Sequence, residues 1–192
     1  MSMDEKIKGK LHSNKAFTLA ETLLAVLILL MVSTIVATGI PVARNAYEKV
    51  VLASNAEVLL STTISTLRNE LGTAMNVDIP GGATENSVKS GSDITYYNSS
   101  RGSSSKISMT SGGTDIQFQR YYSANGFSKG SEPVNLISDK TATNNLHVTY
   151  NQVKYNKDTG IVTFSNLAVK RDSTVLASRE ELSIRVISFT GD

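Results

Sequence analysis

Glu21 is the residue whose position points most directly to chemistry, because no other charged residue lies between Lys15 and Arg44. A carboxylate inside an apolar helix is costly in a membrane, so an acid in such a segment indicates a functional partner of opposite charge. The alternative is that Glu21 lies within one helical turn of the membrane surface and reaches water there. The residues around Glu21 must decide between a paired carboxylate and simple exposure.

Other side chains with reactive potential are few. The sequence has no cysteine, which excludes thiolate metal sites, disulfides and cysteine nucleophiles. It has two histidines, and His147 lies between Leu146 and Val148 on a predicted strand, which favours an exposed or capped strand residue facing away from both over a catalytic base. Motifs of phosphate loops, zinc proteases and serine hydrolases are absent. We therefore expect no catalytic residue, no metal site and no cofactor.

Three weaker patterns have simple structural interpretations. Asn156–Gly160 could suggest a calcium loop, but it lacks the ligand series of an EF-hand, and a hairpin turn fits better. The sequon Asn98-Ser99-Ser100 lies in a Ser-rich segment where three such residues occur by chance, so we assign it no role. Basic residues near the C-terminus alternate with acidic ones, which favours a solvated face over a nucleic-acid surface. These basic residues are Lys154, Lys157, Lys170, Arg171, Arg179 and Arg185.

The element that must position Glu21 is a long apolar segment. The uncharged run Thr22–Ile40 would span about 28 Å as a helix, close to the bilayer core of about 30 Å, and predicts a transmembrane helix over 17–41. The Lys-rich residues before it predict a cytoplasmic N-terminus, with the rest of the chain outside. A cleaved secretory signal fits less well, because the run is longer than a usual signal and apolar residues continue at helical spacing behind it.

That continuation predicts an amphipathic helix over 42–77, which extends the membrane helix into one rod about 90 Å long. Its apolar face consists of Ala43, Tyr47, Val50, Leu60, Ile64, Leu67, Leu71 and Met75. Gly39 and Pro41 predict a bend or local melting of the helix, because proline lacks the N–H and clashes with the preceding turn.

The remaining residues, 78–192, predict a polar β-rich head. Residues 81–132 hold eight of the 13 glycines and few hydrophobic residues, so we expect an irregular surface excursion there. Within it, Ile94–Tyr97 and Thr114–Tyr122 predict one or two short strands.

Behind that excursion, β-branched and aromatic segments over 145–190 predict an antiparallel meander. Asn156–Gly160 and Asp172–Ser173 supply its turns. The amphipathic helix is the natural cover for the apolar face of this sheet, which predicts an α+β fold.

The junction KAFTLAETLLAVLIL makes the N-terminus recognisable. It resembles type IV prepilins and type II secretion pseudopilins, in which a basic leader ends in a small residue before a Phe-led FTLxE segment and an apolar run. The matching residues are Lys15, Ala16, Phe17, Thr18, Leu19 and Glu21. The resemblance covers about residues 10–45, and it implies the type IV pilin fold, a long helix packed on an antiparallel sheet. One departure is Ala16, where the family usually has glycine.

The resemblance also implies how the N-terminus is processed. A prepilin peptidase would cut between Ala16 and Phe17, Phe17 would be N-methylated, and the leader 1–16 would be discarded. Glu21 would then pair with the new N-terminal amine, its own or that of a neighbouring subunit, and guide docking into a filament. Removing the leader takes four of the 19 basic and two of the 17 acidic residues, which leaves 15 of each. The implied partners are sister pilin subunits, the peptidase and inner-membrane assembly machinery.

The sequence thus predicts a pilin or minor pilin, a structural subunit of a type IV pilus-like surface filament. Before assembly it would be a single-pass membrane protein with a cytoplasmic N-terminus. A pseudopilin of a type II secretion or competence system would share this N-terminus, and the Ser/Gly-rich excursion favours the surface pilus. The alternative from another class is an uncleaved, membrane-anchored binding module or adhesin.

Overall fold

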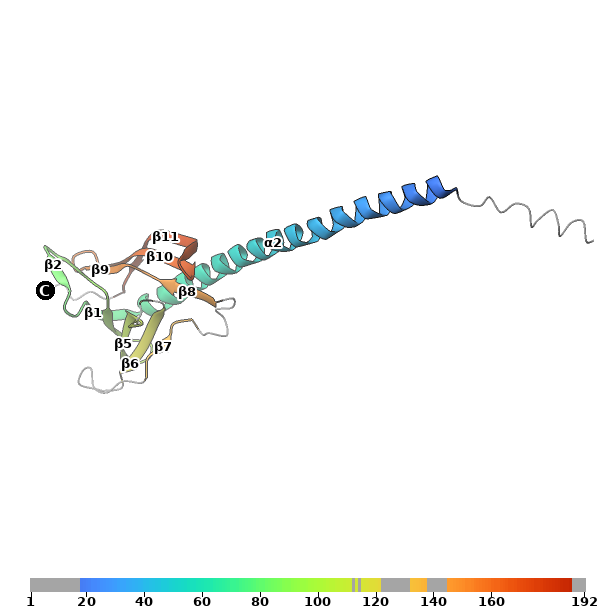
Figure 1. The fold of residues 1–192 in the computed structure, drawn as a ribbon. Coiled ribbons are helices and arrows are strands. Elements are labelled where there is room, and N and C mark those ends of the chain that lie inside the picture. The colour runs from blue at the N-terminus through green and yellow to red at the C-terminus, as the bar shows by residue number, and fades with distance from the viewer. Residues whose placement is uncertain (1–17, 112, 114, 122–131, 138–144, 188–192) are drawn as a thin grey trace, which may run out of the picture. The chain divides into compact units, whose positions relative to one another are not determined.

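The computed structural model describes residues 18–111, 113, 115–121, 132–137 and 145–187. One long helix, α2 (Leu19–Leu71), is followed by antiparallel strands, so the predicted α+β class is confirmed (Figure 1). The chain divides into two compact units, Met1–Glu48 and Lys49–Asp192, and each is described by itself.

The first unit contributes the N-terminal part of α2, which stays helical through Gly39 and Pro41. The predicted local melting at these residues is therefore wrong. Apolar helices tolerate proline because neighbouring turns keep their own hydrogen bonds and hydroxyl side chains help to satisfy nearby carbonyls. Near the proline, Thr38 Oγ1 donates to the carbonyl of Thr34 at 2.9 Å, so this hydroxyl is satisfied within the helix.

The second unit begins with the C-terminal part of α2, which ends at Leu71 rather than at residue 77. Gly72 donates its N–H to the carbonyl of Arg68 at 2.8 Å, and a Cβ at position 72 would lie only 2.7 Å from that oxygen. The chain therefore turns at a glycine and enters strand β1 (Ala74–Asp78). Met75, which we expected on the helix, belongs to this strand instead.

The buried face of α2 also differs from the expected one. Leu60, Leu67 and Leu71 are buried and Ile64 is partly buried, as predicted. Tyr47 and Val50 are exposed, together with Ala43, so they are not part of the face that covers the sheets. The helix instead continues its buried face through residues that the pattern did not include, namely Ala56, Leu59 and Thr63, with Leu52 packed against its edge.

The first sheet is built largely from the segment that we expected to be irregular. Its strands lie in the order β1-β4-β5-β6-β7, and every pair is antiparallel. The strands after β1 are β4 (Ile94–Asn98), β5 (Ser103–Met109), β6 (Ile116–Tyr121) and β7 (Val134–Asn135). The two predicted strands correspond to β4 and β6, but the irregular excursion over 81–132 is wrong for most of its described part.

The second sheet contains the predicted meander. Its order is β11-β10-β9-β3-β2. Strand β8 pairs with the C-terminal part of β10, whereas β9 pairs with its N-terminal part. The meander strands are β8 (Leu146–Thr149), β9 (Gln152–Asn156), β10 (Ile161–Arg171) and β11 (Thr174–Arg185). The excursion adds β2 (Ala83–Glu85) and β3 (Val88–Gly91). Two sheets thus replace the single expected one.

Both predicted turns of the meander are present. Asn156 Oδ1 accepts the N–H groups of Asp158 and Thr159 at 2.9 and 3.1 Å, and Gly160 closes the turn with a positive φ of 64°. Asp172 also has a positive φ, 54°, in the two-residue connection between β10 and β11. Asn, Asp and Gly tolerate this left-handed region at low cost, which is why they occur in tight turns.

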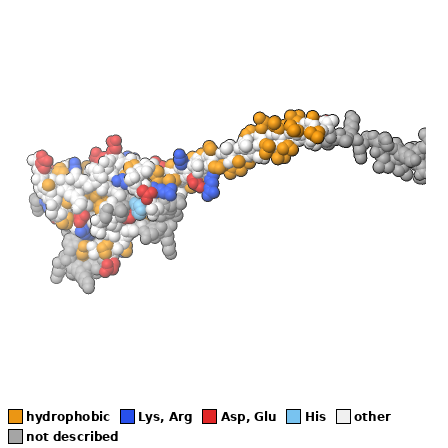
Figure 2. Space-filling model, viewed as in Figure 1, with side chains coloured by type: hydrophobic (Ala, Val, Ile, Leu, Met, Phe, Trp, Pro, Cys, Tyr) orange, Lys and Arg blue, Asp and Glu red, His pale blue; other side chains and the backbone are white. Residues whose placement is uncertain are grey.

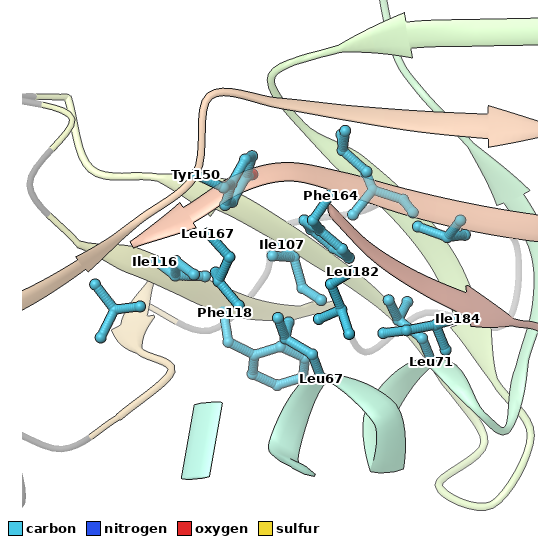
Figure 3. Packing of buried hydrophobic residues seen from close by; sticks show 14 of the residues in the cluster. Leu67, Leu71, Ile107, Ile116, Phe118, Tyr150, Phe164, Leu167, Leu182 and Ile184 are labelled. Carbon is cyan, nitrogen blue, oxygen red and sulfur yellow. The ribbon is translucent and has the colours of Figure 1, made fainter. Parts of the chain in front are cut away.

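The core lies where α2 meets both sheets in the second unit. Figure 3 shows Leu67 and Leu71 of the helix pointing toward Phe118 from β6 and Phe164 from β10, and all four are buried. Full burial of such a side chain contributes about 1.5–3 kcal/mol. Tyr150 meets Phe164 edge to face, with ring centroids 5.2 Å apart. This cluster, and not helical propensity alone, holds the C-terminal part of α2 in place.

Candidate functional site

Thr18 and Glu21 form a reciprocal pair of hydrogen bonds at the start of α2. The N–H and Oγ1 of Thr18 donate to Glu21 Oε2 at 2.9 and 3.0 Å, and the N–H of Glu21 donates to Thr18 Oγ1 at 3.3 Å. This is the capping box, in which a Thr at the N-cap and a Glu three residues later satisfy backbone donors that the first helical turn leaves free. The T-x-x-E spacing could have revealed it in the sequence.

The predicted processing site falls only partly within the described residues. Lys15, Ala16 and Phe17 lie outside them. Thr18 and Leu19 are exposed at the helix start, and Leu19 makes no close packing there, with 83% of its surface accessible. Of the predicted processing and assembly residues that are described, the structure joins Thr18 and Glu21 by hydrogen bonds and leaves Leu19 exposed beside them.

The N-terminal part of α2 carries a fully exposed apolar surface. Within the described residues, the structure has one helix that is long and apolar enough to cross a membrane. Every residue from Thr18 to Val50 is exposed, and Figure 2 shows hydrophobic side chains gathered on the visible face of the N-terminal part of the helix. A surface of this size and composition is unfavourable in water. It therefore needs cover from lipid or protein.

The hydroxyl groups within this apolar part do not leave free donors on its surface. Ser33 Oγ donates to the carbonyl of Leu29 at 2.7 Å, and Thr34 Oγ1 donates to that of Met31 at 2.7 Å. Thr22 does the same with Leu19 at 2.9 Å. Because each hydroxyl proton is used inside the helix, these residues fit an apolar environment.

A second polar site, which sequence reasoning missed, joins the end of α2 to the turn between β4 and β5. Glu70 Oε1 lies 2.9 Å from Arg101 Nη2, and Glu70 Oε2 accepts the side-chain amide of Asn98 at 3.1 Å. The Glu70 side chain is only 10% exposed. Burial and the nearby Glu70 charge raise the pKa of Tyr96 above its ordinary value. We call the contacts of Glu70 with Asn98 and Arg101 the Glu70 clamp.

The Glu70 clamp also explains the sequon. Asn98 is 1% exposed, and its amide nitrogen already donates to Glu70. Its amide oxygen accepts the hydroxyl of Ser100 at 2.7 Å. A glycan on Asn98 would require the folded turn to open, so the sequence motif has a structural role in place of a modification.

His147 has an orientation that the sequence predicted and a partner that it did not. Leu146 and Val148 are buried while His147 faces the other way, where its Nδ1 lies 2.9 Å from Asp115 Oδ2. The pair joins β8 of the second sheet to the residue before β6 of the first. A cavity of about 280 Å³ adjoins it, with Thr63 in its lining. The Thr63 hydroxyl donates to the helical carbonyl of Leu59 at 2.8 Å, an acceptor that cannot take its proton as a general base would.

The described residues contain no arrangement of side chains suited to binding a metal ion. No group of three or more His, Cys, Asp or Glu residues is arranged there to hold an ion. No protein-family model matches the chain, and no curated protein or solved structure matches it either.

Proposed function

We propose that the chain is a structural subunit of a type IV pilus-like filament. In this proposal a prepilin peptidase removes residues 1–16, Phe17 becomes the methylated N-terminus, and the apolar part of α2 first lies in the membrane. Assembly then replaces lipid around this helix with the helices of sister subunits. The binding interface is the helix itself, so the chain acts structurally and catalyses no reaction.

The observation that carries this proposal is the capping box at the start of an exposed apolar helix. Cleavage before Phe17 would create a positively charged amine next to Thr18, whose N–H already donates to Glu21. The carboxylate is thus oriented toward the end of the helix at which the amine would form. It would also interact favourably with the positive end of the helix dipole. A partner charge for Glu21 is therefore available either within the subunit or on a neighbour.

The exposed apolar surface supports the same proposal. A helix that remains in the membrane permanently would account for this surface equally well. Such a helix belongs to the alternative, the membrane-anchored binding module. The basic leader and the Phe-led FTLAE segment favour the filament subunit, because an anchor alone requires neither.

The Ser/Gly-rich composition of the head does not favour a surface pilus over a pseudopilus. The Ser/Gly-rich residues over 81–132 were expected to form an irregular, displayed excursion, yet most of their described part forms strands of two sheets. Much of the Ser/Gly-rich composition belongs to strands and their turns, so it no longer separates the two kinds of filament. Pilus and pseudopilus subunits become two outcomes of one experiment.

That experiment compares a strain lacking the protein with its complemented parent. Surface filaments are imaged and sheared, and secretion and transformation are assayed in parallel. Loss of filaments, with the chain present in sheared parental filaments, is the expected result. Normal pili with failed secretion or transformation would assign the chain to a pseudopilus. Retention of the whole protein in the membrane fraction, with all three readouts normal, would contradict the proposal.

A further inference from the structure

A shallow hollow of about 420 Å³ lies on the outer face of the second sheet, over strands β3, β9, β10 and β11. Its polar lining includes Lys154, Asn156, Thr163, Ser165, Glu181 and Ser183. The volume falls within the range of small-molecule sites in proteins. None of these residues has a role in the proposed filament.

Strand register brings these side chains onto one face. Thr163 lies directly opposite Lys154 on β9 and directly opposite Ser183 on β11. One level further along β10, Ser165 lies opposite Glu181. The intervening residue Phe164 points into the core and is fully buried. Because alternate residues of a strand face opposite sides, the hydroxyls of Thr163 and Ser165 both point outward.

The hydroxyls are ordered by a chain of hydrogen bonds. Ser183 Oγ donates to Glu181 Oε1 at 3.2 Å, and Ser183 Oγ lies 3.1 Å from Thr163 Oγ1. Since the Ser183 proton is used on Glu181, Thr163 must be the donor to Ser183. Thr163 Oγ1 and the second carboxylate oxygen of Glu181 then remain acceptors for a ligand. Such preorganised groups on a rigid sheet bind with little loss of side-chain freedom.

The charges of the hollow are balanced. Among the described residues neither Lys154 nor Glu181 takes part in an ion pair, and one is positive where the other is negative. A hollow that holds one lysine and one carboxylate is a poor site for a phosphate or a nucleic acid, which require clustered cations. The ammonium donates hydrogen bonds, while the carboxylate and the Thr163 hydroxyl accept them.

The hollow lies on a sheet face and not at an unpaired strand edge. Strands β3, β9 and β10 are paired on both sides. Strand β11 is the edge of the sheet, and it lines the hollow with side chains that project from its face, next to β10. A peptide that adds a strand would need a free edge. Val88 and Ile161 border the polar groups and offer apolar contact. A ligand with alternating hydroxyls and C–H groups matches this combination.

We propose that this hollow is a carbohydrate-binding site that takes one or two neutral sugar residues. Lys154 and Asn156 donate hydrogen bonds to sugar hydroxyls, Glu181 and Thr163 accept them, and Ile161 contacts a C–H face. The site belongs to the second sheet, so it is independent of the filament proposal. A small open site binds weakly, in the millimolar range or above, and gains strength only when many copies act together.

The test is an NMR titration of the full-length chain in detergent micelles with maltose, cellobiose, lactose and chitobiose, each raised to about 100 mM, a range suited to weak sites. The expected result is a saturable shift of the backbone amides of Lys154, Thr163 and Glu181 with at least one of the four sugars. Sodium phosphate and spermidine serve as charged comparison probes. Shifts with a charged probe and none with any sugar, or no shift at this site with any probe, would overturn the proposal.

Two variants make the result specific to the hollow. Thr163→Val and Glu181→Gln should each weaken sugar binding about three- to tenfold, the equivalent of one net hydrogen bond. Thr174→Val is the matched control, because Thr174 is exposed on the same strand as Glu181 but lies at the β10–β11 turn. Unchanged binding in both hollow variants, with native spectra, would contradict the assignment of the site.

Discussion

The carboxylate of Glu21 accepts both the backbone N–H and the hydroxyl of Thr18, at 2.9 and 3.0 Å, and so closes the first turn of α2. This relationship gives Glu21 a local structural task besides the assembly role that we propose. The two roles require different chemistry. Capping needs an acceptor oxygen, which glutamine also has, whereas pairing with an amine is much stronger with a negative charge.

The first prediction separates these roles by substitution of Glu21. Glu21→Ala should leave membrane insertion intact and impair incorporation into filaments. Glu21→Gln, which keeps the capping box but removes the charge, should impair incorporation to a similar degree. Incorporation is measured as the ratio of chain in sheared filaments to chain in membranes. Normal incorporation of the Gln variant, with a defect in Thr18→Val, would instead assign Glu21 to capping alone.

The second prediction concerns the Glu70 clamp. Glu70→Ala leaves the Asn98 amide buried without its acceptor, which should lower the free energy of unfolding by about 1–3 kcal/mol. Arg101→Ala should cost less than Glu70→Ala, because the Asn98 amide keeps its acceptor, although the Glu70 carboxylate, only 10% exposed, then lacks its cation. Chemical denaturation in detergent, followed by tyrosine fluorescence, measures both. Equal losses in the two variants would mean that the ion pair, and not the amide, dominates the clamp.

A third prediction compares Gly39, inside α2, with Gly72, the residue directly after its end. Gly72→Ala should destabilise the second unit, because the new Cβ would lie 2.7 Å from the carbonyl oxygen of Arg68. Gly39→Ala is the matched control, since nothing lies within 4 Å of a Cβ at that helical position. The control should be neutral or stabilise the helix by about 0.5–1 kcal/mol. Thermal unfolding of both variants gives the comparison, and a stable Gly72→Ala protein would refute our account of the helix end.

The fourth prediction is a pH dependence at β1. Partial burial would raise the pKa of Asp78, but the hydrogen bond and charge of Lys89, 2.6 Å away, outweigh it and lower the pKa below its ordinary value. A carboxyl with a lowered folded-state pKa stabilises the fold above the unfolded pKa, and this contribution is lost as the pH falls through the folded pKa. Stability should therefore fall less steeply below about pH 4 in Asp78→Asn than in the parent. Identical acid profiles would contradict this contribution.

The sequence predicted the parts of the fold in which periodicity and burial agree. Leu67 and Leu71 mark a helix face, and the alternation around Phe118 marks a strand, so both elements were expected. The first sheet was missed because Ser103 and Ser105 are buried at inward positions of β5, where the polar pattern suggested solvent. A serine fits an inward position when space is small, and hydropathy alone does not reveal this.

The candidate sites divide in a similar way. The Thr18–Glu21 pair could have been predicted, because its spacing of three is that of a capping box. The Glu70 clamp could not, because Glu70 and Arg101 are brought together only by the packing of the helix end on the β4–β5 turn. The same holds for His147, in β8 of the second sheet, and Asp115, immediately before β6 of the first. Local patterns thus predict local contacts, whereas contacts between distant elements require the fold.

The central claim is that α2 becomes the N-terminal element of a processed filament subunit. Mass spectrometry of the intact mature protein, with sequencing of its N-terminal peptide, tests this claim most directly. We predict a chain that begins at N-methylated Phe17 and lacks residues 1–16. A mature chain that keeps residues 1–16, or one that begins near Thr38, would contradict the claim.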